Sequence, residues 1–293
     1  MGTQDAETIQ GKISPGVSAS GGATQLQLQP SGFLIELSLD WIVQRASENI
    51  HQLIGESHVT LIDEPLSRFV QAQALHDLRN HFSRLSGSTG VAKAYRVRLT
   101  DDRARCDVAF QLVGSRVLLE AVPSPEYGLG ESLGAVGGLI DGLAALSGDA
   151  LLDGAARRMR ALTGCDGCII QIGEKRATSS RGKFSLSEKI PAAGLPAFIA
   201  DTEAATVPIF PRKSKDGSIA SAMLKAPSAA DAQALREQAV RSLISVPLIS
   251  RGQPPGVVHC GYRMPQKPNF ELHGASELFG QMFALRLEID KLS

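Results

Sequence analysis

Apolar and polar residues alternate in two short segments of the first third of the chain. The segments 33–38 and 41–46 both alternate in this way, and the short turn Leu39-Asp40 separates them, so we predict two paired strands. Apolar residues at helical spacing then run from Pro65 to Ser86 and predict a helix. Three further strands are expected at 95–99, 106–113 and 115–122. This order predicts a sheet with helices on one side.

A cluster of turn-forming residues at 124–130 marks a boundary, and a second region follows it. Residues 132–162 have a helical pattern that breaks near Ser147. The glycines at 134, 137, 138 and 142 indicate close packing against another helix, or they merely weaken this one. A strand at 167–172 and a long amphipathic helix at 274–292 complete the predicted outline.

The most distinctive unit lies at 240–262. Two apolar runs, 242–249 and 256–262, flank the turn-forming residues 251–255, and a helical pattern at 231–239 precedes them. Apolar, β-branched runs on either side of a Gly/Pro turn predict two adjacent antiparallel strands.

Composition narrows the class of protein. The 293 residues are 43% hydrophobic, which is enough for two cores of ordinary domain size. Thirty basic and thirty acidic residues cancel, and no five like charges follow one another, so neither nucleic acid nor a membrane surface is an expected partner. No apolar run reaches the roughly 18 residues of a membrane helix, and the first residues do not resemble a secretory signal. We therefore expect a cytoplasmic protein.

The four cysteines are expected to be free thiols. Cys165 and Cys168 have the spacing of a redox or zinc pair, but the sequence contains no second pair. Cys168 begins an apolar strand, whereas Cys165 lies in the preceding turn, so their side chains need not converge. We interpret both cysteines as incidental and expect no metal site.

Enzymatic chemistry is not expected from the remaining motifs. The segment 76–80, His-Asp-Leu-Arg-Asn, looks like the phospho-acceptor box of a sensor histidine kinase, but the chain has no Gly-rich nucleotide lid to supply a phosphate. An exposed helix face is the favoured interpretation. No nucleophile stands near a base at a plausible spacing, and no carboxylates are paired in a Gly-rich setting.

Several short strings, taken in order, resemble a known family. They are Ile-Ala-Asp at 199–201, Val-Pro-Ile at 207–209, Leu224-Lys225, the unit at 240–262, and Glu-Leu-Phe-Gly-Gln at 277–281, with 33–55 in the first half. Together they resemble the PAS-GAF photosensory module of bacteriophytochromes.

This resemblance implies an α/β (α+β) fold with antiparallel sheets flanked by helices. A tail at 1–30 would precede a PAS domain at 31–125 and a GAF domain at 126–293, the latter with linker helices at both ends. The resemblance also implies a figure-of-eight knot, in which the tail passes under a loop at about 208–229.

The resemblance carries over a set of positions that contact bilin in the family: Lys225, Asp231, Ser242, Ser245 and His259. Lys225 keeps a cation where the family has a propionate-binding arginine. Asp231 places a carboxylate where the family has a pocket histidine, and a carboxylate repels bilin carbonyls and propionates unless it contacts the cationic ring nitrogens. The pocket is therefore expected to be degenerate.

Two further positions lack the pocket side chains that the family has. Ala197 stands where a second arginine is usual, so one bidentate clamp on a carboxylate is lost. If Cys260 matches the family's cysteine, Gly261 replaces another pocket histidine.

Covalent attachment of biliverdin is not expected. A thioether needs a thiol, but the tail before Phe33 contains no cysteine and residue 232, beside the usual pocket histidine, is alanine. Biliverdin is the cofactor that the resemblance implies, but without a cysteine at either place we expect either no cofactor or one that the sequence does not identify.

The expected function is that of a sensory input module of phytochrome type rather than an enzyme. It would regulate a downstream output, such as the histidine kinase of a two-component system, and would form a homodimer through its linker helices. The alternative is a red/far-red photoreceptor that binds bilin noncovalently.

Overall fold

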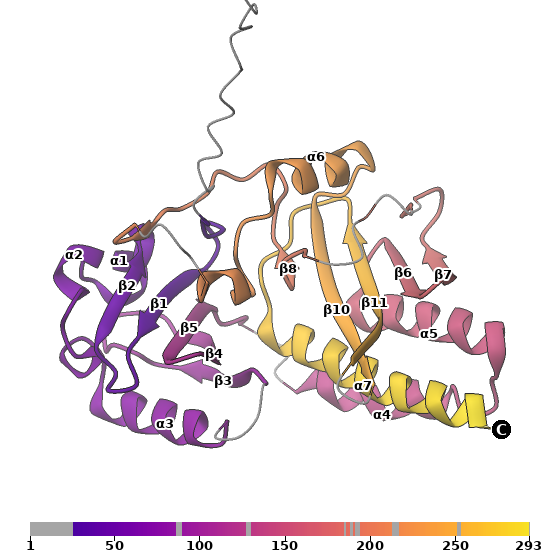
Figure 1. Ribbon diagram of the computed structural model, residues 1–293, viewed down its shortest axis with the longest axis horizontal. Coiled ribbons are helices and arrows are strands. Elements are labelled where there is room, and N and C mark those ends of the chain that lie inside the picture. The colour runs from indigo at the N-terminus through magenta and orange to yellow at the C-terminus, as the bar shows by residue number, and fades with distance from the viewer. Residues whose placement is uncertain are drawn as a thin grey trace, which may run out of the picture.

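Two antiparallel sheets, each with its own helices, form the two lobes of the computed structural model (Figure 1). The structure describes residues 26–85, 90–126, 130–184, 186–187, 190, 194–212, 217–250 and 253–292. The mixed α/β fold predicted from the sequence is confirmed. Among the described helices, none has the length and hydropathy that crossing a membrane requires. The expected domain limits, 31–125 and 126–293, stay predictions.

The N-terminal sheet has the strand order β3-β4-β5-β1-β2-β9. Its strands are β1 (Phe33–Leu37), β2 (Val43–Ser47), β3 (Ala92–Val97), β4 (Cys106–Val113), β5 (Arg116–Pro123) and the short β9 (Ile209–Phe210). Strand β1 is buried along its whole length because its two faces serve two cores. Phe33 and Ile35 pack within the N-terminal lobe, whereas Leu34 belongs to the core that continues into the C-terminal lobe.

Short helices pack against the N-terminal sheet: η1 (Glu48–Ile50), α1 (His51–Ile54), α2 (His58–Leu61), η2 (Leu66–Arg68) and α3 (Ala72–Ser83). The sequence predicted one helix from 65 to 86, but a single turn at η2 is separated from α3. Gln71 has an extended backbone between them, and its N–H donates to the carbonyl of Leu99 at 2.8 Å. This tertiary hydrogen bond overrides the helical pattern.

The C-terminal sheet has the order β7-β6-β11-β10-β8. Its strands are β6 (Gly167–Ile172), β7 (Lys175–Ser180), β8 (Phe198–Ile199), β10 (Ser242–Ser250) and β11 (Gln253–Tyr262). The predicted hairpin is present, although β11 begins before the expected Gly256. The pattern missed β7, because its outward side chains are polar and its inward ones, Ala177 and Ser179, are small.

Helices α5 (Gly148–Thr163) and α7 (Phe270–Leu292) lie against one face of this sheet, and α4 (Glu131–Asp141) packs against these two helices. Helix α6 (Ala229–Glu237) lies near the end of β10 that is farther from α7 (Figure 1). The short helix η3 (Ile219–Ser221) precedes α6. Helix α7 begins earlier than predicted because the side chain of Asn269 accepts a hydrogen bond from the N–H of Leu272 at 3.0 Å.

Of the four glycines expected to pack closely, Gly142 at the end of α4 does so, since a Cβ atom there would lie 2.5 Å from the guanidinium of Arg158 on α5, whereas the other three do not. A Cβ atom added at Gly134, Gly137 or Gly138 would meet no heavy atom within 4 Å. The helix is therefore accessible along this side in the described part of the chain.

The start of the described chain lies between two segments of the C-terminal half. The N–H of Leu28 donates to Val207 at 2.9 Å, and the N–H of Gln29 donates to Leu224 at 3.0 Å. The side chain of Gln29 donates to the carbonyl of Phe198 at 2.6 Å. The knot implied by the resemblance also depends on residues outside the described ranges, so it stays a prediction.

Candidate ligand-binding site

The β10–β11 hairpin forms the middle of the C-terminal sheet and has two different faces. Ser245 lies opposite His259 in the register of the two strands, and Leu243 lies opposite Gly261. Because side chains alternate along a strand, these four residues share one face, which we name the outer face. The other face, which includes Ile244, packs in the core with α5 and α7.

One end of the outer face is filled by side chains. Phe184 and Leu186, from the segment after β7, are buried there with Ile169 and Leu243. A Cβ atom on Gly261 would lie 2.7 Å from Cδ2 of Leu186, which is closer than carbon atoms pack. We name this part the filled end. A methyl group on Gly261 would require the side chain of Leu186 to shift.

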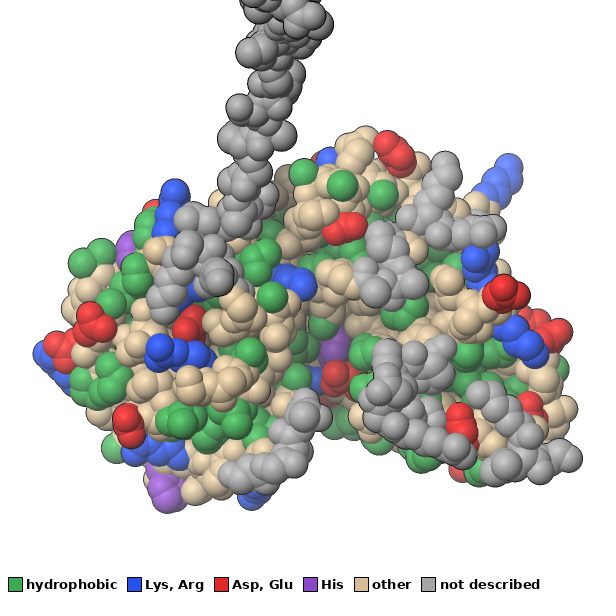
Figure 2. Space-filling view, viewed as in Figure 1, with side chains coloured by type: hydrophobic (Ala, Val, Ile, Leu, Met, Phe, Trp, Pro, Cys, Tyr) green, Lys and Arg blue, Asp and Glu red, His purple; other side chains and the backbone are tan. Residues whose placement is uncertain are grey.

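The other end of the outer face opens into a cavity of about 410 Å³, which we name the β10 cavity. Its walls come from β10 and β11, from the segments 194–197 and 220–225, from α7, and from Val91 and Gln111 of the N-terminal lobe. Figure 2 shows the surface hollowed between the two lobes. A volume of this size is typical of pockets that hold small molecules.

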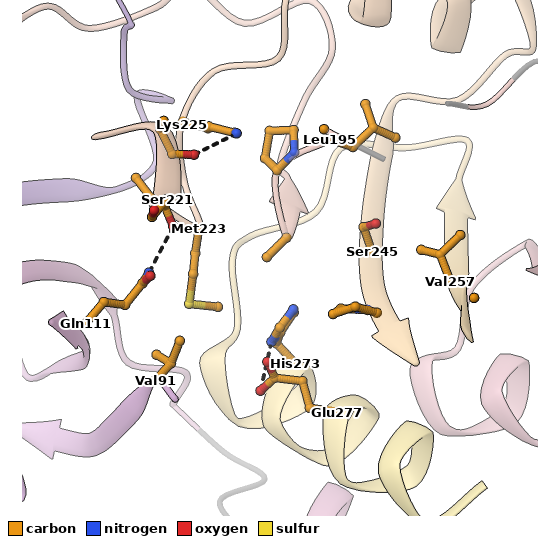
Figure 3. Close-up of a pocket in the computed structure, with 17 residues that line it drawn as sticks. Val91, Gln111, Leu195, Ser221, Met223, Lys225, Ser245, Val257, His273 and Glu277 are labelled. Carbon is orange, nitrogen blue, oxygen red and sulfur yellow. Dashed lines mark hydrogen bonds and ion pairs between the residues drawn. The ribbon is translucent and has the colours of Figure 1, made fainter. Parts of the chain in front are cut away.

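Two of the residues expected in a pocket line the β10 cavity. Lys225 lies at its rim, where the ammonium group donates to the carbonyl of Ala220 at 2.8 Å, and Ser245 lies on the sheet wall (Figure 3). Ala197 lines the cavity as well. The structure therefore brings together a cation and a hydroxyl that are distant in the sequence.

The other three expected residues, Asp231, Ser242 and His259, are not among the described residues that line this cavity. The hydroxyl of Ser242 donates to the carbonyl of Ile199 at 2.6 Å and so ties β10 to β8. His259 is buried, with Nδ1 at 3.0 Å from the hydroxyl of Ser245. Asp231 lies in the first turn of α6. Their assignment as bilin contacts stays a prediction.

Sequence reasoning missed two cavity residues, His273 and Glu277, which lie one turn apart on α7. Lys93 of β3 forms an ion pair with Glu277, and Nδ1 of His273 lies 3.4 Å from the same carboxylate. Burial alone would raise the pKa of Glu277, but the hydrogen bond and charge of His273, together with Lys93, lower it to about 2. Glu277 is therefore ionised at neutral pH and connects the two lobes.

Part of the group formed by Lys93, His273 and Glu277 could have been predicted from the sequence. His273 and Glu277 have the i, i+4 spacing of neighbours on a helix surface. Lys93, however, comes from the other half of the chain, and no local pattern links it to α7.

The cysteines form a buried group that spacing alone did not predict. Cys260 lies opposite Cys168 in the register of β11 and β6, and Cys165 interacts with Cys260. The interaction with Cys260 and burial raise the pKa of Cys165, and the pKa of Cys260 is raised as well. Both thiols are therefore protonated and poor nucleophiles at neutral pH.

Comparison with known families identifies the second half of the chain. Residues 147–290 match the model of the GAF domain. No curated protein sequence matches the chain.

Solved structures extend the likeness to both lobes. The chromophore-binding domain of an unusual bacteriophytochrome, RpBphP3 from R. palustris, superposes with a TM-score of 0.74 at 19% identity, over 91% of this chain and 96% of that one. The wild-type chromophore-binding domain of Stigmatella aurantiaca phytochrome P1 gives 0.73 at 19% identity, over 91% and 98%.

A larger structure from the same organism places the match within a longer chain. The photosensory core module of Stigmatella aurantiaca phytochrome gives a TM-score of 0.73 at 19% identity, over 90% of this chain and 58% of that one. Residues 147–290 therefore match the GAF domain, and the chain has the fold of bacteriophytochrome chromophore-binding domains.

Proposed function

We propose that this chain is a sensory input module of phytochrome type that does not hold a bilin covalently. In this proposal it regulates a downstream output, such as the histidine kinase of a two-component system. The likeness to bacteriophytochrome chromophore-binding domains supports the sensory assignment. The filled end supports the loss of ordinary bilin binding.

The filled end is the observation that carries this proposal. If Cys260 matches the family's cysteine, Gly261 stands where the family has a pocket histidine, and Leu186 occupies the space that such a side chain would need. Leu186 and Phe184 are 4% and 8% exposed, so they belong to a packed core rather than to the wall of an open cleft. A four-ring bilin lying along the whole outer face would collide with them.

The cysteines support the absence of a thioether. All four are buried, and none lines the β10 cavity. A thioether forms from an accessible thiolate, whereas Cys165 and Cys260 have raised pKa values within the core.

The test is to add biliverdin to the purified protein and to record absorption spectra after illumination with red and with far-red light. We expect no stoichiometric, photoconvertible adduct. The variant Lys175→Met, which changes an exposed side chain that does not line the cavity, should behave identically. A stoichiometric red-absorbing adduct would refute the proposal.

A second candidate is a photoreceptor with noncovalent bilin. The β10 cavity favours it, because Lys225 and Ser245 line one space and could bind a propionate. Co-expression with a heme oxygenase decides between the two: this candidate requires visible absorbance in the purified protein, and a colourless protein rules it out.

No catalytic role is proposed. Within the described residues, no three His, Cys, Asp or Glu side chains are arranged to hold a metal ion. Ser245 and His259 are hydrogen-bonded, but they face each other as a buried cross-strand pair, which explains the contact without catalysis.

We propose a homodimer formed through α4 and α7. Helix α7 carries three exposed apolar side chains, Leu278, Leu285 and Ile289, and α4 presents exposed Leu133 beside its glycines. An exposed apolar stripe of this kind is typical of an interface. Replacing Leu285 by Glu should shift the sedimentation of a dimer toward monomer, whereas Val59→Glu, at an exposed site on α2, should not.

A further inference from the structure

His273 presents a buried polar atom to the β10 cavity. The residue is 1% exposed, and no described residue gives its Nε2 atom a hydrogen-bond partner. Figure 3 shows the ring rising from α7, with Glu277 beside it and Lys225 on the far side of the cavity. A buried polar atom without a partner destabilises a protein, so a ligand that bonds to it gains affinity.

The surroundings of the other ring nitrogen define what Nε2 can bind. Nδ1 lies 3.4 Å from both the Glu277 carboxylate and the Lys93 ammonium group. If Nδ1 donates to Glu277, Nε2 accepts in a neutral ring and donates in a charged one; if Nδ1 accepts from Lys93, Nε2 donates. A ligand hydroxyl satisfies both arrangements, because a hydroxyl both donates and accepts.

The charges around the cavity favour an anion at the opposite rim. Lys93 and Glu277 neutralise each other, since they form an ion pair. Lys225 donates to the carbonyl of Ala220, and no carboxylate among the described residues pairs with it. A ligand carboxylate near Lys225 would make a charge-assisted hydrogen bond.

The remaining walls are largely apolar. Met223, Leu195, Pro196, Pro247 and Val257 all line the β10 cavity. Methionine and proline surfaces of this kind suit a flat, apolar ring.

We infer that the β10 cavity binds a small hydroxylated aromatic carboxylate, with its hydroxyl on Nε2 of His273 and its carboxylate on Lys225. Ligand binding itself does not depend on the proposed sensory function. Only the signal that binding would produce rests on that function. Because His273 contacts Glu277 and Glu277 pairs with Lys93, an occupied site changes the contact between the two lobes. The same helix carries the stripe proposed for dimerisation.

Calorimetric titration of the full chain with para-hydroxyphenylacetate tests the site. Phenylacetate lacks the hydroxyl and para-hydroxyphenylethanol lacks the carboxylate, so each should bind about tenfold more weakly. His273→Gln should lose the preference for para-hydroxyphenylacetate over phenylacetate. Lys225→Met should lose the preference for para-hydroxyphenylacetate over para-hydroxyphenylethanol. His76→Gln and Lys175→Met, at exposed sites outside the cavity, should leave all three affinities unchanged.

A second measurement needs no variant. In protein with isotope-labelled histidine, para-hydroxyphenylacetate should shift the Nε2 resonance of one imidazole, and that resonance should be missing in His273→Gln. The inference is overturned if wild-type protein gives no saturable binding at millimolar ligand, if the three compounds bind equally, or if no imidazole resonance moves.

The two proposals fail separately. A photoconvertible biliverdin adduct would refute the proposed function, while binding of the hydroxylated carboxylate between His273 and Lys225 still stood. Absence of both kinds of binding would refute the ligand site and leave a module that signals through dimerisation. Loss of biliverdin binding in both His273→Gln and Lys225→Met would show that the cavity holds a bilin instead and would overturn the inference.

Discussion

The filled end and the β10 cavity lie on the same face of the same hairpin, yet one is a packed core and the other is open. At the filled end, Phe184 and Leu186 come from one local segment and pack onto Gly261. Around the cavity, the walls come from separate parts of both lobes and include charged groups held in pairs. The sheet therefore does not determine where a ligand fits; the segments that cover it do.

The largest expected effect tests whether the filled end is a true core. Phe184→Ala should lower the free energy of unfolding by about 3–5 kcal/mol, because it leaves a cavity in packed surroundings. Urea denaturation measures this change. Met264→Ala, at a side chain that is 68% exposed, should change it by less than about 0.5 kcal/mol. Equal, small effects would mean that the filled end is an open cleft.

The wall of the cavity should respond to pH, whereas the wholly apolar filled end should not. Glu120 of β5 accepts hydrogen bonds from the N–H groups of Met223, which lines the cavity, and Leu224. Burial raises the pKa of Glu120 from 4.5 to about 7, although these hydrogen bonds oppose the rise.

A raised pKa in the folded state means that the unfolded chain releases this proton first. The stabilisation by the protonated form is complete below the ordinary pKa near 4.5 and is lost as the pH rises through about 7. The free energy of unfolding should therefore fall between about pH 5 and 8. Glu120→Gln should remove that fall, and an unchanged slope in this variant would show that another group causes it.

The ion pair beside the cavity provides a third comparison. Lys93→Met should destabilise the protein by about 1.5–3 kcal/mol, because it removes the cation bonded to a partly buried carboxylate. Lys175→Met removes an exposed cation 3.8 Å from Asp149 and should have almost no effect in the same denaturation experiment. Equal effects would contradict the role assigned to Lys93.

The smallest effect addresses the glycine at the filled end. Gly261→Ala should destabilise the protein by about 1–3 kcal/mol, because its Cβ would overlap Leu186. In a Leu186→Ala background the same substitution should be nearly neutral, and a double-mutant cycle measures this coupling. Additive effects would show that Leu186 does not occupy the space above Gly261.

The sequence predicted the local elements better than the site. The alternation around Phe33 and the apolar runs of the β10–β11 hairpin were enough to place strands, since each depends on neighbours along the chain. Lys225 and Ser245 could be expected in a pocket because the family resemblance carried them. The Lys93–Glu277 contact could not be predicted, because it joins a strand and a helix from opposite halves of the chain.

The filled end also could not be foreseen. Gly261 was recognised as a substitution, but a glycine in a strand has no pattern that identifies its neighbour. Only the packing of Leu186 against it distinguishes an empty pocket from a filled one.

Absorption spectroscopy of the purified protein with biliverdin tests the central claim most directly. The filled end predicts no stoichiometric red-absorbing species and no difference spectrum after alternating red and far-red illumination. A stoichiometric, photoconvertible adduct would show that a bilin fits along the outer face, and it would contradict this account.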